Sequence, residues 1–216
     1  LQEILYMQCG PIRHSMEGLQ TDLIKQLIVR ETCFTQLPDE QKPIQEVFRL
    51  LVHDEARNAL IQQDVLSAVA EGRRCLILSQ WKEHCRMLAD GLVKAGIAPV
   101  VFEGTLGKKE RNALLEGIDA TPKNKPLVVI ATGQYLGEGF DCPQIDTLLL
   151  VFPVAFKGKL VQYVGRILRS FEGKDRAVVY EYADLQAPVL RSMHVKRLRS
   201  YKSLEFEEIK DAVPDF

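Results

Sequence analysis

Residues 127–143 read LVVIATGQYLGEGFDCP, an apolar run followed at once by a loop that contains three glycines. Residues 127–130 are apolar at every position, which is typical of a strand covered on both faces in a parallel sheet. Glycines after such a strand let the backbone approach a phosphate closely, and a carboxylate such as Asp141 can accept a hydrogen bond from a ribose hydroxyl. An ordinary flexible loop has the same composition, so spacing alone leaves both interpretations open.

Similar apolar runs lie on both sides of this stretch, at residues 75–78, 99–102, 148–151 and 177–180. Helical patterns separate most of them, among them residues 108–118. Strands that are apolar on both faces and alternate with helices predict an α/β fold, a three-layer α/β/α sandwich with a mainly parallel sheet. Ligands of such sheets bind at the carboxyl ends of the strands, so we expect functional residues just after Leu78, Phe102, Ile130 and Val151.

The amino-terminal part of the chain has a looser pattern. Residues 4–7 and 27–29 are typical of short strands, and residues 44–51 of an amphipathic helix. Asp54 is placed to cap a second helix, which Gly72 would end. We therefore predict a strand and helix extension over residues 1–72 and a main domain over residues 73–216.

A terminal helix is predicted over residues 190–204. Its outer face is basic, with Arg191, Lys196, Arg199 and Lys202. Such a stripe usually means a solvated face, and contact with nucleic acid is the alternative.

Composition narrows the class of protein. The 216 residues are 46% hydrophobic and 26% charged, with a formal net charge of −1, as in a soluble globular protein. This balance excludes an overall basic coat, although a local basic groove remains compatible with it. The sequence has no apolar run of about 20 residues for a membrane span and no secretory signal. It also lacks an initiator Met, which predicts a piece of a longer protein.

The cysteines set the expected compartment. Their number is five, an odd count, and none forms a CxxC pair. A disulfide framework and a zinc site are therefore disfavoured. We expect reduced thiols in a cytoplasmic protein and no bound metal in this chain.

A second motif follows at residues 159–169, KLVQYVGRILR. On a helix, Leu160, Val164, Ile167 and Leu168 share one face. Gln162, Arg166 and Arg169 then lie within about 60° of each other on the opposite face. Two guanidiniums one turn apart repel each other, and a polyanion between them would offset that cost. Two unrelated arginines on a solvated face are the simpler alternative.

The order ATGQYLGEGFDCP and then QYVGRILR resembles motifs V and VI of superfamily 2 helicases, with Leu76 to Gln80 in the place of motif IV. The resemblance covers residues 73 to about 185, the second RecA-like domain of those enzymes. The motif sequences are most similar to those of DEAD/DEAH-type helicases related to the R (Res) subunits of restriction enzymes. Residues 7–13, MQCGPIR, are similar to the connection that leaves the first helicase domain in that group.

The resemblance implies a role for each matching residue around a nucleotide. Arg169 is similar to the arginine finger that reaches the γ-phosphate, and Arg166 to its companion. Gln162 resembles the polar residue that opens motif VI. Asp141 matches a ribose contact and Gly139 a backbone contact near the nucleotide, and Glu138 faces the same cleft.

Nucleic-acid contacts follow from the same comparison. Thr132 resembles the motif V hydroxyl that binds the nucleic-acid backbone, and the resemblance implies a similar contact for Ser79. The family places a nucleic-acid-facing loop near Lys108 and Lys109, so these two lysines are candidates for phosphate contacts, with a solvated helix start as the alternative.

Half of an ATP site is missing from the sequence. Residues 104–109, GTLGKK, have the wrong spacing for a phosphate-binding loop, and no Ser or Thr follows the lysine. Residues 54–57, DEAR, resemble a DEAD box superficially but sit in a helical pattern. The resemblance thus implies that ATP and Mg²⁺ are bound mainly by a first helicase domain of the same polypeptide, and that this chain alone is inactive.

We therefore expect this chain to be the carboxyl-terminal motor domain of an ATP-dependent DNA helicase. DNA is preferred over RNA because the motif sequences resemble those of restriction-enzyme subunits. A RecA-like module that binds nucleic acid or protein without catalysis is the alternative. A nucleotide-sugar or mononucleotide enzyme with a similar sheet is a third interpretation, and the arginine pair after the glycine-rich loop disfavours it. Membrane partners are not expected.

Overall fold

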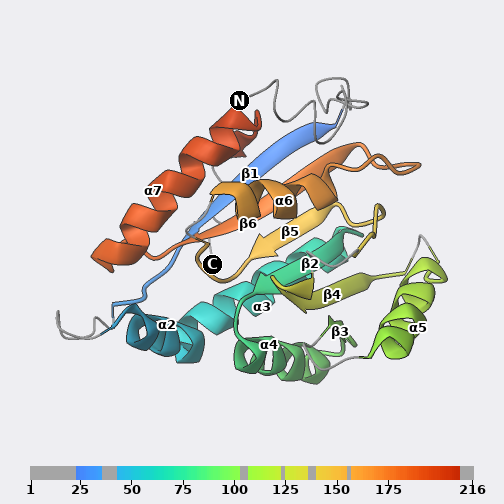
Figure 1. Cartoon of the computed structure of the whole chain (residues 1–216), viewed down its shortest axis with the longest axis horizontal. Helices are drawn as coiled ribbons and strands as arrows, with labels where there is room; N and C mark the ends of the chain where they lie inside the picture. The colour runs from blue at the N-terminus through green and yellow to red at the C-terminus, as the bar shows by residue number, and fades with distance from the viewer. Residues whose placement is uncertain are drawn as a thin grey trace, which may run out of the picture.

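One seven-stranded sheet organises the described part of the chain, residues 23–35, 43–102, 107–122, 125–135, 140–154 and 157–209 of a computed structural model (Figure 1). The elements in chain order are β1 (Ile24–Glu31), α2 (Ile44–His53), α3 (Glu55–Ala70), β2 (Arg74–Ser79), α4 (Lys82–Lys94), β3 (Val100–Phe102), α5 (Lys108–Asp119), β4 (Leu127–Thr132), β5 (Thr147–Leu150), α6 (Lys157–Ile167), β6 (Arg176–Ala183), α7 (Pro188–Ser203) and β7 (Glu207–Ile209).

The strand order is β3-β4-β2-β5-β6-β1-β7, and each neighbouring pair within the described ranges is parallel. The predicted α/β class and parallel sheet are confirmed. The segments between successive strands are long enough for the crossover connections that parallel pairing requires.

Alternating side chains along each strand build the three layers. In β2, Cys75 and Ile77 belong to the cluster that contains α3 and α4. Leu76 and Leu78 point the other way, into the cluster that α6 and the end of α7 complete. Because both faces are covered by helices, every residue of β2, β4 and β5 is buried.

The described part of residues 1–72 shares this sheet. β1 pairs with β6 over its whole length, and α3 packs beside β2. The predicted strand at residues 27–29 is confirmed inside β1, whereas the one at residues 4–7 lies outside the described residues. The division at residues 72 and 73 stays a prediction, and the structure shows no change of sheet there.

The helix predicted after Asp54 is confirmed as α3. The Asp54 carboxylate accepts a hydrogen bond from the backbone N–H of Arg57 at 2.7 Å, and Gly72 ends the segment with a φ of 78°. Residues 54–57 therefore form a helix cap, and their likeness to a DEAD box is coincidental, as the helical pattern predicted.

The terminal helix predicted over residues 190–204 is confirmed as α7, but the segment after it differs from the prediction. α7 ends at Ser203, and the chain then adds β7, a short strand beside β1. β7 has exposed glutamates at its first two positions, so no apolar run marks it in the sequence.

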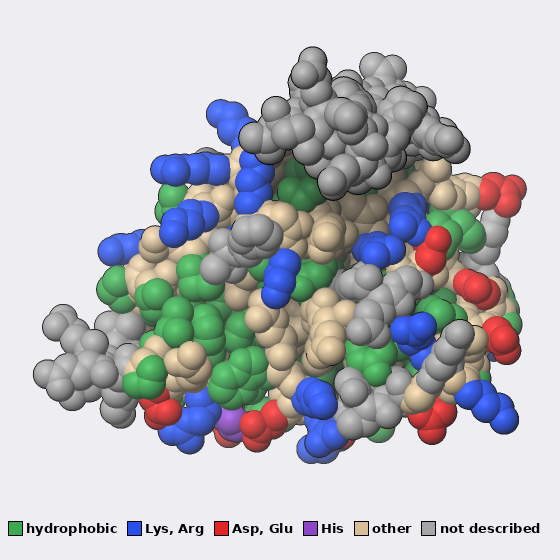
Figure 2. Space-filling view, in the orientation of Figure 1, with side chains coloured by type: hydrophobic (Ala, Val, Ile, Leu, Met, Phe, Trp, Pro, Cys, Tyr) green, Lys and Arg blue, Asp and Glu red, His purple; other side chains and the backbone are tan. Residues whose placement is uncertain are grey.

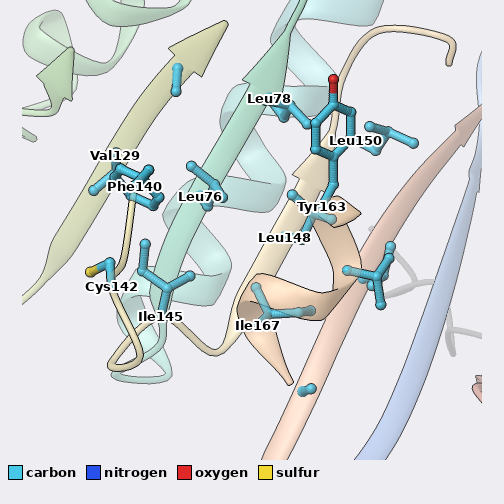
Figure 3. Packing of buried hydrophobic residues seen from close by; sticks show 14 of the residues in the cluster. Leu76, Leu78, Val129, Phe140, Cys142, Ile145, Leu148, Leu150, Tyr163 and Ile167 are labelled. Carbon is cyan, nitrogen blue, oxygen red and sulfur yellow. The ribbon is translucent and has the colours of Figure 1, made fainter. Parts of the chain in front are cut away.

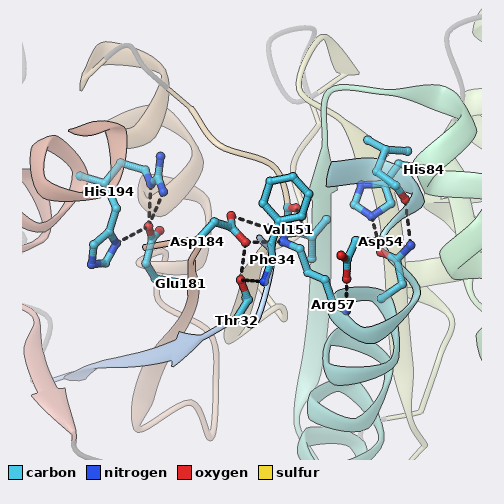
Figure 4. Close-up of polar contacts among 12 residues, drawn as sticks. Thr32, Phe34, Asp54, Arg57, His84, Val151, Glu181, Asp184 and His194 are labelled. Carbon is cyan, nitrogen blue, oxygen red and sulfur yellow. Dashed lines mark hydrogen bonds and ion pairs between the residues drawn. The ribbon is translucent and has the colours of Figure 1, made fainter. Parts of the chain in front are cut away.

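A buried carboxylate fastens α7 to the sheet. Glu181 of β6 accepts hydrogen bonds from Arg197 Nε at 2.7 Å and from the Tyr201 hydroxyl at 3.1 Å, and it lies 3.0 Å from His194 Nδ1 (Figure 4). Burial by itself raises the pKa of Glu181, but Arg197 and His194 hold it below its usual value.

Among the described helices, none has the length and apolar character of a bilayer span.

Candidate functional site

The loop after β4 and the end of α6 meet at one exposed place. Asp141 and Arg169 form an ion pair between side chains that are 61% and 40% exposed. Beside them, Arg166 Nη1 donates a hydrogen bond to the carbonyl oxygen of Phe140 at 2.7 Å. The structure thus brings together three of the residues that the sequence assigned to a nucleotide.

The two faces of α6 explain how the arginines are presented. Leu160, Tyr163, Val164 and Ile167 are buried on the sheet, while Gln162 is exposed. Figure 3 shows Tyr163 and Ile167 directed toward the strands. This confirms the predicted amphipathic face. One detail differs, because α6 ends at Ile167 and Arg169 lies just beyond the helix. Its backbone is therefore set by the following loop rather than by helical hydrogen bonds.

The electrostatics of Arg166 favour an anion. Burial lowers its pKa, the positive charge of Arg169 lowers it further, and Asp141 opposes both. A guanidinium in this position gains from an additional negative group, because such a group would offset both the burial and the repulsion between the arginines.

Lys174 is a residue that the sequence analysis missed. Its ammonium donates three hydrogen bonds to main-chain carbonyls, those of Pro143 at 3.1 Å, Ile145 at 2.7 Å and Arg169 at 2.9 Å. The side chain therefore ties the end of the glycine-rich loop to the arginine loop. Burial lowers the pKa of Lys174 to about 8. A pattern of side chains in the sequence could not predict this role, because all three acceptors are backbone carbonyls.

A close contact joins the start of the loop to α6. Gly133 follows β4 directly, and a Cβ at this position would overlap the hydroxyl of Tyr163. A side chain here would force Tyr163 or the loop to shift, because the loop backbone passes against the buried face of the helix.

Ser79 and Thr132 lie elsewhere, paired with each other at the carboxyl ends of β2 and β4. Asp141, Arg166 and Arg169 lie near the opposite edge, because Lys174 links their loops just before β5 and β6 begin. These three candidates therefore do not lie at the carboxyl ends of the strands, where the sequence analysis expected functional residues. A long loop and an antiparallel helix carry them back across the sheet.

The hydroxyl of Ser79 is used inside the protein. It lies 3.0 Å from Nδ1 of His84 and accepts a hydrogen bond from the backbone N–H of Trp81 at 3.2 Å. Both Ser79 and Thr132 are buried. Their assignment to nucleic acid stays a prediction, and the structure presents neither side chain at the surface of the described residues.

The remaining candidates are separate from the arginine site. Lys109 is exposed on the first turn of α5, away from α6, and the side chain of Lys108 lies outside the described part of the chain. Glu138 and Gly139 also lie outside the described residues, so the predicted cleft and backbone contacts at the nucleotide stay predictions.

Comparison with solved structures supports the fold. The crystal structure of phage T4 UvsW superposes with a TM-score of 0.65 and 17% identity, covering 87% of this chain and 41% of that chain. The structure of the C-terminal domain of the DEAD-box protein Dbp5 gives a TM-score of 0.54 and 17% identity, covering 87% of this chain and 89% of that chain. These likenesses show a RecA-like fold.

Comparison of sequences gives distant relatives. The chain is 28% identical over 132 residues to the transcript termination protein OPG145 of monkeypox virus, covering 60% of this chain and 26% of the relative. It is 24% identical over 132 residues to the transcript termination protein A18 of myxoma virus, covering 60% and 27%. The chain therefore spans about a quarter of the length of these relatives.

Residues 55–171 match the family described as the helicase conserved C-terminal domain. The match begins at α3 and ends after Arg169, so it contains the sheet from β2 to β5, the glycine-rich loop and both arginines. The chain belongs to the helicase C-terminal domain family and has the second RecA-like domain of the superfamily 2 helicases.

Proposed function

We propose that this domain is the second motor domain of an ATP-dependent DNA helicase or translocase and completes an ATP site that a first helicase domain of the same polypeptide begins. The observation that carries the proposal is the pairing of Arg169 with Asp141 beside Arg166, at the end of a helix whose other face is fixed on the sheet. These are the groups that a triphosphate and a ribose would meet.

The chemistry that Arg169 would perform is charge stabilisation. In phosphoryl transfer, negative charge spreads over the equatorial oxygens, and a correctly placed arginine increases the rate by about 10³–10⁵. In this structure Asp141 neutralises the Arg169 guanidinium. Closure of the two domains would exchange that carboxylate for a phosphate, which leaves Asp141 available to the ribose, with Gln162 exposed on the same side of α6.

The proposal assigns the remaining parts of the ATP site to the first domain. That domain would supply the phosphate-binding loop and the Asp-Glu pair that holds Mg²⁺. The curated relatives are about four times longer than the part of them that this chain covers, which leaves room for such a domain. We place the protein in the cytoplasm and propose that nucleic acid stimulates it, DNA rather than RNA.

ATP hydrolysis tests the proposal directly. Two samples are compared, the chain alone and the chain joined to the polypeptide encoded upstream of it, each without nucleic acid and with single-stranded DNA, double-stranded DNA or RNA. We expect turnover only in the joined protein, with stimulation by DNA. Turnover by the chain alone would contradict the shared site. Binding of nucleic acid without turnover in either sample would favour the non-catalytic module instead.

The arginine finger is tested in the joined protein. We expect Arg169→Ala to lower kcat by about 10³–10⁵ while the affinity for ATP changes far less. Arg49→Ala is the matched control, because Arg49 is an exposed arginine of α2 that pairs with Glu46 three residues away. Near-normal turnover of Arg169→Ala at saturating ATP and DNA would contradict the assignment.

A further inference from the structure

Helices α6 and α7 form a basic surface on one side of the sheet. Both pack on the same sheet face and contact each other. Within their bounds they carry eight Lys and Arg residues and no Asp or Glu, in a chain whose net charge is −1. Figure 2 shows Lys and Arg side chains gathered at the upper left, where Figure 1 places α7. This local excess of positive charge is larger than the composition of the chain predicts.

A cavity of about 330 Å³ lies between the two helices. Lys157 stands on the α6 side of it, and Lys196 and Arg199 stand on the α7 side. The other lining residues are Val154, Leu160, Arg197 and Ser200. The cavity therefore has an apolar floor and a cationic rim drawn from two helices.

The rim cations lack carboxylate partners among the described residues. Lys157, Lys196 and Arg199 are exposed, and none of them forms an ion pair within the described ranges. Arg197 is different, because Glu181 neutralises it beneath the surface at 2.6 Å. Like charges held together around a hollow repel each other, and a bound polyanion offsets that repulsion.

The cations continue beyond the cavity along α7. Arg199 and Lys202 follow Lys196 at intervals of three residues, and Arg191 precedes Lys196 by five residues, which is about 1.4 helical turns. From Arg191 to Lys202 the helix rises about 16 Å, which is the length of about five phosphates along one strand of a duplex. A single phosphate would engage only the cavity, whereas a phosphate backbone would engage the whole row.

We propose that the surface between α6 and α7 is a binding site for the phosphate backbone of nucleic acid. Successive phosphates of one strand sit at Lys157, Lys196 and Arg199 around the rim, and the strand continues along α7. This site is additional to the predicted contacts at Ser79, Thr132, Lys108 and Lys109, which lie at other strand ends and on α5. It rests on the proposed function in one respect, that nucleic acid is the polyanion.

The test measures binding of the 216-residue chain to a fluorescein-labelled single-stranded oligothymidylate by anisotropy over a series of salt concentrations. We expect Lys196→Gln/Arg199→Gln to weaken binding and to reduce the slope of log K against log salt by about 1.4, which is two phosphate contacts on a single strand. Lys157→Gln, on the other helix, should reduce the slope by about 0.7.

Lys94→Gln/Lys125→Gln is the matched control. It removes the same charge from exposed positions, at the end of α4 and after α5. We expect it to leave the slope unchanged. Inorganic phosphate, added at constant ionic strength, should displace the oligonucleotide poorly, because it cannot engage the row along α7.

Three results would overturn the inference: no binding of the oligonucleotide by the chain, equal slopes for the α7 variant and the control, or efficient displacement by inorganic phosphate, which would indicate a site for a single anion. None of them decides the proposed function, which depends on ATP turnover in the joined protein. Conversely, a joined protein without turnover would contradict the motor while the anisotropy result still stood.

Discussion

At the scale of single residues, His84 shows how a buried polar group fixes its own chemistry. Nδ1 lies 3.0 Å from the Ser79 hydroxyl and Nε2 lies 3.0 Å from the Asn58 amide oxygen. The Asn58 nitrogen donates to the carbonyl of Val52, so its oxygen must accept from His84. The proton therefore sits on Nε2, and the neutral ring satisfies both neighbours. Burial, followed by the charges of Arg57 and His53, lowers the pKa of His84 to about 3.

This shift predicts that stability falls in mild acid. Above pH 6.5 the ring is neutral in the folded and unfolded chains, so its contribution is complete. Below that pH the His84 ring is protonated in the unfolded chain but stays neutral in the folded chain. The free energy of unfolding therefore falls by about 1.4 kcal/mol for each unit by which the pH decreases. Urea unfolding between pH 7 and about 5 measures this slope. His84→Gln should lack this part of the slope, and equal slopes in the two proteins would contradict the assignment.

Gly133 gives a second prediction at the scale of residues. Gly133→Ala places a methyl group against the Tyr163 hydroxyl, so we expect a loss of about 1–3 kcal/mol in the free energy of unfolding. Adding Tyr163→Phe removes the obstructing oxygen and should restore most of that loss. Gly117→Ala in α5 is the control, because a Cβ there meets no atom within 4 Å. A loss in Gly133→Ala that Tyr163→Phe leaves unchanged would show that the contact is not the cause.

At the scale of elements, the sequence predicts what is periodic and misses what is not. The apolar runs of β2, β4, β5 and β6 and the two-faced pattern of α6 are visible because burial on a sheet repeats along the chain. β7 is short and exposed at the edge, so it leaves no such pattern. The acceptors of Lys174 come from two separate loops, and only the fold brings them together.

Lys174 joins two elements of the arginine site, so we expect its loss to affect kcat more than the affinity for ATP. Lys174→Met leaves three carbonyls without their donor and frees the backbone of Arg169, which we expect to cost about 1–3 kcal/mol in stability. In the joined protein kcat should fall while KM for ATP changes little, since the finger acts mainly in the transition state.

Lys174→Arg and Lys125→Met are the matched variants for this prediction. The first keeps a cationic donor and should recover part of kcat. The second removes an exposed lysine after α5 and should change nothing. A Lys174→Met protein with reduced stability but normal kcat would show that the lysine supports the fold without positioning Arg169.

At the scale of the whole molecule, the fold was predictable because the order of strands and helices specifies a parallel sheet, whereas the site was predictable only in part. Asp141, Arg166 and Arg169 meet as the motif resemblance implied. Their position away from the carboxyl ends of the strands was not foreseen, because the length of a loop does not reveal where it ends. The interior role of Ser79 was also hidden, since its partner His84 belongs to the next helix.

The same scale reveals a buried ionic network that joins three strands to one helix. Thr32, Val151 and Asp184 each follow a strand directly, after β1, β5 and β6. Arg57 of α3 donates to Asp184 at 2.9 Å and to the carbonyl of Val151 at 2.8 Å, while the Thr32 hydroxyl donates to Asp184 at 2.6 Å (Figure 4). Arg57 and Asp184 are both almost completely buried.

Removing one charge from this network should loosen the whole sheet. Asp184→Asn leaves the Arg57 guanidinium buried without a counter-charge, which we expect to cost about 3–5 kcal/mol and to lower Tm by about 10 °C in a chain of this size. Asp175→Asn is the control, because Asp175 forms an exposed pair with its neighbour Arg176 and should leave Tm unchanged. The double change Arg57→Met/Asp184→Leu should recover part of the loss, since it removes both charges together. Scanning calorimetry measures Tm for each variant. If Asp184→Asn has the same Tm as the control, the network does not hold β1, β5 and β6 to α3. If the double variant has a lower Tm than Asp184→Asn, the hydrogen bonds to Thr32 and Val151 contribute more than the charge pair.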